Sequence, residues 1–180
     1  MRQLLYVFGL AVLLSGINTS CKTTSLDTMH DDEVAARTKY VTDKKLTDFK
    51  DASGIYFKDS IQGTDTTWVR AGFKVMLTYN ITLLNGTVIF TTDDGAGHTY
   101  DEVPFYVDVS NTTVNVNYVQ QIAGLHVGLK KMHIGDTAKM VIPSELAFKA
   151  VDNSSLGIPR FSTLLATVYV KRGYSPAQQK

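Results

Sequence analysis

The sequence predicts an α+β domain in which an antiparallel β-sheet packs against one α-helix, with a further helix outside the domain, before it. Two observations support this prediction. Short segments between residues 55 and 170 alternate apolar and polar side chains, which is typical of strands with one buried face. Residues 118–132 instead repeat apolar side chains at spacings of three and four, which indicates a helix with one apolar face.

The composition fits one globular domain with additional segments at its ends. The chain has 180 residues, of which 44% are hydrophobic and 19% are charged, so it can form a real core and is not expected to be disordered. Its formal net charge is +1, and its lysines and arginines are scattered through the sequence. This charge pattern suggests neither a nucleic-acid partner nor an acidic partner.

The first 20 residues have the features of a bacterial secretory signal peptide. Arg2 precedes an apolar run over residues 4–14, which is shorter than the roughly 20 residues that a membrane-spanning helix needs. Cys21 follows and is the only cysteine, so it cannot form an internal disulfide. Its position resembles a lipoprotein cleavage site, although Asn18 stands where such sites usually have an apolar residue.

We therefore predict an exported protein of the bacterial cell envelope. In the main interpretation, lipidated Cys21 anchors it to a membrane, and the folded part faces the periplasm or the cell surface. The alternative is a soluble periplasmic protein that is cleaved nearby and keeps Cys21 as an unmodified thiol.

A tether and a helix are expected between the signal peptide and the domain. Residues 21–31 are polar and aperiodic, and we interpret them as the tether. Acidic residues at 31–33 favour the start of a helix, whose first turn attracts negative charge. Val34, Thr38 and Val41 form an incomplete apolar stripe, and Ser53–Gly54 is a stop signal. The prediction is a helix over residues 32–50 that leans on the domain with its apolar side.

The predicted domain covers residues 54–172. Between two of its strands, Asn85–Gly86 predicts a tight hairpin turn. A long loop with a short helical turn is expected at 143–159, and residues 173–180 form a polar tail. Strands are expected at residues 55–57, 73–81, 87–90, 104–109, 137–142 and 162–170.

Several motifs follow one another along this domain. The clearest runs from Ile122 to Asp136 and reads Ile-Ala-Gly-Leu, then Gly-Leu-Lys-Lys-Met-His-Ile-Gly-Asp, and Ile142–Phe148 then reads Ile-Pro-Ser-Glu-Leu-Ala-Phe. The remaining motifs are Tyr79, Asn85–Gly86, Phe90, Pro104–Phe105, Gly157–Pro159 and Ser162–Leu164. Over residues 54–172 the sequence resembles the FKBP family of peptidyl-prolyl cis/trans isomerases, which implies an FKBP-like fold with a curved sheet.

The resemblance implies catalysis without a nucleophile, metal or cofactor. Rotation about a peptide bond costs about 18–20 kcal/mol because twisting destroys its resonance. A twisted prolyl amide has less charge separation than a planar one, so an apolar pocket binds it better than water does. The expected partner is a proline-containing polypeptide segment, with the carbonyl next to the proline bound by a backbone N–H.

The resemblance also implies a set of site residues. The proline ring would lie on Leu125, and the backbone N–H of Ile122 would bind the substrate carbonyl. The competing interpretation is that these apolar side chains form ordinary core. The candidate catalytic residues are Tyr79, Phe90, Ile122, Leu125 and Phe148, and the candidate substrate-binding residues are Thr91, Phe105, Ile158 and Ala166.

The sequence departs from the family pattern at several of these positions. Thr91 replaces the aspartate that usually follows the hairpin phenylalanine, and an extra hairpin residue would allow Ile89 to take the place of Phe90. Phe148 lacks the hydroxyl of the family's tyrosine, and Lys149 replaces the glycine after it. Each lost hydrogen bond would slow catalysis by about two- to tenfold.

Ala166 also replaces an aromatic residue of the last strand, and together the changes leave three hypotheses open. The first is an isomerase that assists the folding of exported proteins. The second is a catalytically weak or inactive binding or chaperone lipoprotein that keeps the fold. The third is a structural lipoprotein subunit, since a fold alone does not determine a function.

No metal is expected from the sequence. The histidines His30, His98, His126 and His133 are dispersed, without the spacing to cysteine or carboxylate that metal sites show. Residues 93–97 lack the alternating oxygen ligands of a calcium loop. The Asn111–Asn117 segment is longer than the family usually has, and is either a flap beside the pocket or an insertion.

Overall fold

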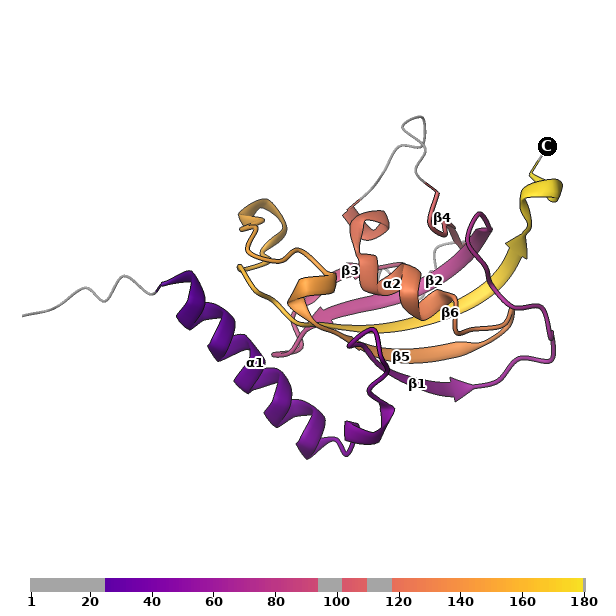
Figure 1. The fold of residues 1–180 in the computed structure, drawn as a ribbon. Helices are drawn as coiled ribbons and strands as arrows, with labels where there is room; N and C mark the ends of the chain where they lie inside the picture. Colours follow the sequence, from indigo (N-terminus) through magenta and orange to yellow (C-terminus); the bar gives the residue numbers. More distant parts are fainter. Residues whose placement is uncertain (1–24, 94–101, 110–117, 180) are drawn as a thin grey trace, which may run out of the picture.

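One antiparallel sheet curves around the short helix α2 (Ala123–Leu129), as Figure 1 shows. The structure is a computed structural model that describes residues 25–93, 102–109 and 118–179. Its strands lie in the order β1-β5-β6-β2-β3, and β4 also pairs with β2. They are β1 (Tyr56–Ile61), β2 (Lys74–Leu83), β3 (Val88–Thr91), β4 (Val103–Tyr106), β5 (Thr137–Ile142) and β6 (Leu164–Tyr174). The predicted fold class is confirmed.

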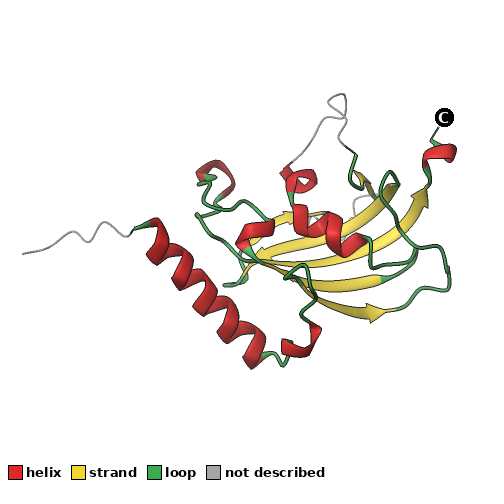
Figure 2. Cartoon of the chain, viewed as in Figure 1, coloured by secondary structure: helices red, strands yellow, loops and turns green. Residues whose placement is uncertain are grey.

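The helix predicted over residues 118–132 is divided in two. A 3-10 turn, η2 (Tyr118–Gln121), comes first, and α2 follows after Ile122, whose backbone is extended at φ −77° and ψ 97°. Apolar spacings of three fit a 3-10 turn as well as an α-helix, so the periodicity alone does not show the break. Figure 2 shows α2 lying across one face of the sheet.

Two glycines allow α2 to lie close to β5. A Cβ atom on Gly124 would be 2.3 Å from Cγ2 of Ile142, and one on Gly128 would be 2.3 Å from the sulfur of Met140. At these distances no side chain larger than hydrogen fits unless the neighbours move. The core is then formed by α2 and the inward-facing side chains of β2, β5 and β6.

The hairpin between β2 and β3 contains the extra residue that the sequence indicated. Gly86 has a φ of +88°, which a glycine adopts without strain. Ile81 pairs with Phe90, but Thr82 pairs with Val88, so Ile89 is the unpaired residue of a bulge. Phe90 therefore keeps its place opposite a core residue, and Ile89 does not replace it.

The N-terminal helix α1 (Leu26–Asp43) begins six residues before the predicted start at Asp32. Ser25 caps it, because its Oγ accepts the N–H of Thr28 at 3.1 Å. A 3-10 turn, η1 (Thr47–Phe49), follows it. Part of the predicted tether is thus helical, since the capping serine was a stronger start signal than the acidic residues further along.

The expected apolar contact of α1 with the domain is small. Only Glu33 and Val41 are buried on this helix. No helix of the described segments has the length and apolar character needed to cross a membrane. The predicted signal peptide, Cys21, His98 and the Asn111–Asn117 segment lie outside the described residues.

Candidate functional site

The floor of the candidate site is formed by α2 and the residue before it. The side chains of Ile122 and Leu125 are 0% and 1% exposed. They belong to the same apolar cluster as Phe105 of β4 and Ala166 of β6. Four predicted site residues from three distant segments are thus brought together on the inner face of the sheet.

Tyr79 of β2 stands beside this floor. Its half-buried ring packs against the apolar cluster, and its strand partner is Val168 of β6. Burial raises the pKa of the Tyr79 phenol above its ordinary value, so the hydroxyl stays protonated at neutral pH and can donate a hydrogen bond.

Two phenylalanines complete the walls. Phe90 lies on β3 and Phe148 in the loop after β5, and both are half-buried against the cluster. Their ring centroids are 6.4 Å apart and the rings are tilted by 43°, a distance and an angle at which aromatic rings attract each other. The predicted site therefore has adjacent aromatic walls from two segments that are far apart in the sequence.

Thr91 does not join these walls. Phe90 pairs with Ile81, which is buried on the inner face, and successive strand residues point to opposite faces. Thr91 is accordingly exposed on the outer face. Instead, Thr92 is buried beside Tyr79, accepting its N–H at 3.0 Å and donating to its carbonyl at 3.2 Å.

Ile158 also lies apart from the cluster. Its side chain is 1% exposed, but it lines a different cavity, of about 600 Å³, together with Met29 of α1 and Pro159. Its N–H donates to the carbonyl of Asn153 at 3.1 Å. The structure thus brings seven of the nine predicted residues together and leaves Thr91 and Ile158 outside.

The backbone N–H of Ile122 already has a partner. It donates to the carbonyl of Val119 at 3.2 Å across η2. A substrate carbonyl would have to share this donor or replace Val119. Since Ile122 and Leu125 are almost completely covered, a proline ring would also have to separate the walls formed by Tyr79, Phe90 and Phe148.

With this geometry in place, the chain was compared with known proteins. The profile of the FKBP-type peptidyl-prolyl cis-trans isomerases matches residues 66–171. The chain belongs to this family. No curated protein matches it.

Solved structures share the FKBP fold. FkpA from Escherichia coli matches with a TM-score of 0.65 and 22% identity. The match covers 84% of this chain and 63% of the FkpA chain. A peptidyl-prolyl cis-trans isomerase from Pseudomonas syringae pv. tomato matches with a TM-score of 0.61 and 20% identity. The match covers 81% of this chain and 96% of the isomerase chain. AtFKBP13 has a TM-score of 0.55 at 22% identity, covering 70% and 98% respectively.

The FKBP-type site has polar supports that the sequence did not indicate. Gln120 of η2 accepts the N–H of Tyr106 at 3.0 Å and donates to the carbonyl of the same residue. Nδ1 of His126 accepts the N–H of Asp108 at 3.0 Å, and its Nε2 lies 2.8 Å from the carbonyl of Gln120. A neutral imidazole with its proton on Nε2 satisfies both contacts. The His126 ring also lies 4.7 Å from that of Phe105, so these contacts hold η2 and α2 against β4.

Lys149, which stands where the family pattern has a glycine, has a backbone conformation that favours glycine. Its φ is +56°, in the left-handed region that favours glycine. Its N–H donates to the carbonyl of Ser144 at 2.9 Å, and its own carbonyl accepts the N–H of Phe161 at 2.8 Å. Both backbone groups of Lys149 are thus hydrogen-bonded, which fixes the loop beside Phe148.

A possible metal cluster lies at α1, outside the FKBP-type site. Ligand atoms of His30, Glu33 and Glu145 lie within 4.8 Å of one another, which the sequence spacing did not suggest. However, Nη1 of Arg37 is 2.9 Å from Oε1 of Glu33 and 3.0 Å from Oε2 of Glu145. Glu33 also accepts a hydrogen bond from Thr163. The guanidinium of Arg37 already binds both carboxylates, so the cluster is best explained as an ionic contact between α1 and the domain.

Proposed function

We propose that this protein is a peptidyl-prolyl cis/trans isomerase that assists the folding of exported proteins in the bacterial cell envelope. The observation that carries the proposal is that Tyr79, Phe90 and Phe148 pack against the apolar cluster that contains Leu125, in a chain of the FKBP-type family. Uncatalysed prolyl isomerisation takes about 10–100 s, so catalysis would remove a slow step in folding.

The site suits this reaction by its shape and its low polarity. An apolar floor at Leu125 excludes water from a prolyl amide, and exclusion of water favours the twisted, less polar amide. The Tyr79 hydroxyl is a donor at this site and is able to hold a substrate carbonyl, whereas the N–H of Ile122 would have to be shared with Val119 or released from it. Thr92 holds the backbone of Tyr79 by two hydrogen bonds, which limits movement of that wall.

A coupled assay on residues 22–180 tests the isomerase directly. The cis-to-trans rate of a chromogenic Leu-Pro-Phe peptide should exceed the buffer rate at micromolar protein. Phe148→Tyr, which restores the family's hydroxyl, should raise the rate by about two- to tenfold, whereas Phe161→Tyr, a control in the neighbouring loop, should not. If the unsubstituted chain and both variants gave the same rate as buffer, the isomerase function would be rejected.

A second function is favoured by one feature of the site. Ile122 donates its N–H within the chain, and the floor is covered, so a segment bound on the walls alone would not be twisted efficiently. The alternative is therefore a binding or chaperone module with weak or no catalysis. Saturable binding of the same peptide in calorimetry, together with a rate equal to that in buffer, would select this alternative.

We further propose that a lipid on Cys21 anchors the protein to a membrane of the envelope. The support comes from the sequence, where an apolar run over residues 4–14 precedes a single cysteine. Mass spectrometry of the N-terminal peptide from native membranes should find a diacylated Cys21 as the first residue. An unmodified Cys21 thiol, or cleavage at another bond, would contradict the proposed lipid anchor.

A further inference from the structure

A second cavity, of about 450 Å³, lies on the outer face of the sheet. The end of α1 and the η1 turn cover it with Tyr40, Leu46 and Phe49, and its floor includes Tyr56 of β1 and Leu165 of β6. These five side chains give the cavity an aromatic and aliphatic part. The volume falls within the range of about 300–1,000 Å³ that is usual for small-molecule sites.

Three lysines line the same cavity. They are Lys44 at the end of α1, Lys58 of β1 and Lys139 of β5. The described residues that line the cavity include no aspartate or glutamate. The remaining polar lining consists of neutral side chains such as Asn80 and Thr167, so the charge of this cavity is positive only.

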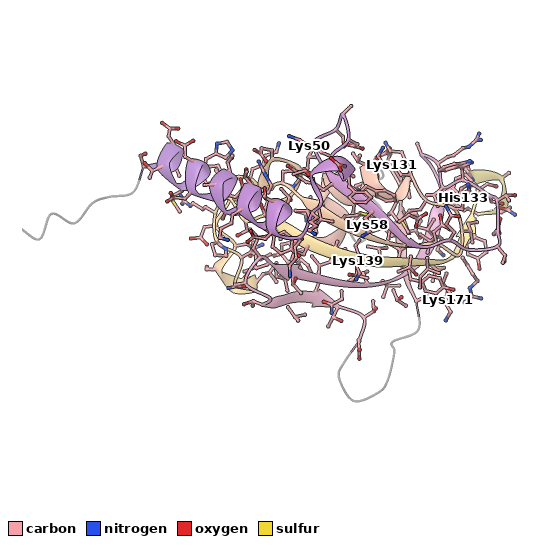
Figure 3. All side chains as sticks on the ribbon, turned by 90° about the horizontal axis from the view of Figure 1, so that it is seen from below. Lys50, Lys58, Lys131, His133, Lys139 and Lys171 are labelled. Atoms are coloured by element: carbon pink, nitrogen blue, oxygen red, sulfur yellow. The ribbon has the colours of Figure 1, made fainter. Side chains whose placement is uncertain are left out.

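Two of these lysines are direct neighbours across the sheet. Lys58 and Lys139 are partners in the ladder between β1 and β5, and Figure 3 shows them next to each other on this face. Like charges that lie opposite each other destabilise a sheet. The ammonium group of Lys58 is 5.2 Å from the ring centroid of Phe49, which offsets part of this cost. An anion between the two ammonium groups would remove the rest.

Two lysines elsewhere in the domain are paired with carboxylates. Nζ of Lys130 lies 2.6 Å from Asp108, and Nζ of Lys131 lies 2.6 Å from Asp51. Neither of these lysines lines the cavity. The three lysines of the cavity have no carboxylate among the residues that line it and are thus cations on an aromatic surface, a combination that fits a ligand with both a charged and an apolar part.

We propose that this cavity binds a small amphipathic anion, with an aromatic or aliphatic body and a carboxylate, sulfonate or phosphate head. The head lies between Lys58 and Lys139, and the body packs on Tyr56 and Leu165. Because the cavity is on the opposite face of the sheet from Tyr79, the ligand does not occupy the FKBP-type site. Because the cavity is shared by α1, η1 and the sheet, the ligand also strengthens the attachment of α1.

Two fluorescent probes of matched shape test the proposal on residues 22–180. Anilinonaphthalenesulfonate has the required aromatic body and anionic head, and N-phenylnaphthylamine has the same rings without the sulfonate. The sulfonate probe should saturate one site and bind about tenfold more tightly than the neutral probe, since two ammonium groups contact its head.

Lysine variants locate the site. Lys58→Gln combined with Lys139→Gln should weaken binding of the sulfonate probe about tenfold, and Lys139→Gln alone should weaken it less. The control is Lys45→Gln combined with Lys171→Gln, which removes the same net charge from exposed lysines that do not line the cavity. An unchanged unfolding midpoint shows that each variant is folded.

Three results would overturn the proposal. Equal affinity for the two probes would mean that the cavity is merely apolar. An equal loss in the control variant would mean that the probe responds only to net charge. A dimer in size-exclusion chromatography that excludes the probe would mean that a second copy of the chain occupies this face.

Discussion

The two α-helices of the described chain are attached to the same sheet by opposite means. The helix α2 has seven residues, and its buried residues face the core. The helix α1 has 18 residues and a polar surface, and it contacts the domain mainly through the ionic cluster at Arg37. The buried residues are Gly124, Leu125, Gly128 and Leu129 on α2, but only Glu33 and Val41 on α1.

This difference indicates how each helix depends on the fold. A helix of seven residues is not stable alone in water, so α2 must form together with the sheet that covers it. A capped helix of 18 residues with its own ion pairs, such as Arg37 with Glu33 and Lys39 with Asp43, is closer to stability alone. We therefore expect α2 to unfold only with the domain and α1 to detach from it reversibly.

The largest effect is expected at the contact between α2 and β5. Gly124→Val would place side-chain atoms where Cγ2 of Ile142 lies, so the helix must move away from the sheet. The free energy of unfolding should fall by about 3 kcal/mol, because overpacking distorts the core. The measurement is urea unfolding followed by circular dichroism. The matched control is Ala123→Val at the exposed neighbouring position, and an equal loss there would show that a β-branched side chain at any position of α2, and not the contact with Ile142, is responsible.

A smaller and different effect is expected at α1. Arg37→Ala leaves Glu33 buried without its cation, so α1 should detach while the domain remains folded. Spin labels at Ala36→Cys and Val151→Cys, both exposed positions, report the distance between α1 and the domain. The detached fraction should rise about tenfold, which corresponds to about 1.4 kcal/mol. Lys39→Ala is the control, because its ion pair with Asp43 lies within the helix. Loss of the whole fold in Arg37→Ala would contradict the proposed independence of α1.

The smallest effect is expected from pH, through His30 and Glu145. Burial alone would raise the pKa of the Glu145 carboxyl, but hydrogen bonds from His30, its own backbone and Arg37 lower it from 4.5 to about 2. Its contribution to docking is therefore complete above pH 4.5 and is lost as the pH falls towards 2. The hydrogen bond to Glu145 raises the pKa of His30 above 6.5, so the His30 contribution is complete below pH 6.5 and is lost as the pH rises through the raised value.

The same spin-label distance should accordingly show the most docked α1 between pH 4.5 and 6.5. The change outside this window is expected to be only a few-fold, since both groups are partly exposed and screened by water. Glu145→Gln should remove the acidic limb, and His30→Gln should remove the alkaline limb. Docking that stays constant with pH in the unsubstituted chain would exclude the ionic contact as a support of α1.

Much of the fold was predictable because it depends on local patterns. The strand Thr137–Ile142 was predicted with its observed bounds, since a glycine precedes it and a proline ends it. The helix over residues 118–132 was predicted too long, because a turn at Ile122 does not interrupt a spacing of three. The start of α1 was predicted too late, since Ser25 caps a helix that has almost no apolar periodicity.

The candidate site was predictable only in part. The order of the motifs along the chain was enough to predict that Tyr79, Phe90 and Leu125 belong to one site, and all three lie in or against one apolar cluster. The place of Thr91 was predicted wrongly, because the family pattern was followed there although strand alternation after an inward Phe90 puts Thr91 on the outer face and Thr92 on the inner one. The scattered lysines of the sequence likewise gave no sign that Lys58 and Lys139 would meet.

The sequence by itself determined the family, the elements and the apolar character of the site, because these follow from residue types and their local spacing. Only the tertiary structure decided which side chains lie beside Tyr79, how a carboxylate and a guanidinium hold α1, and where lysines gather on the outer face. Several of these contacts join residues far apart in the sequence, such as Glu33 and Thr163, which are 130 positions apart. They depend on strand register and on the sum of many weak packing energies, which no local pattern records.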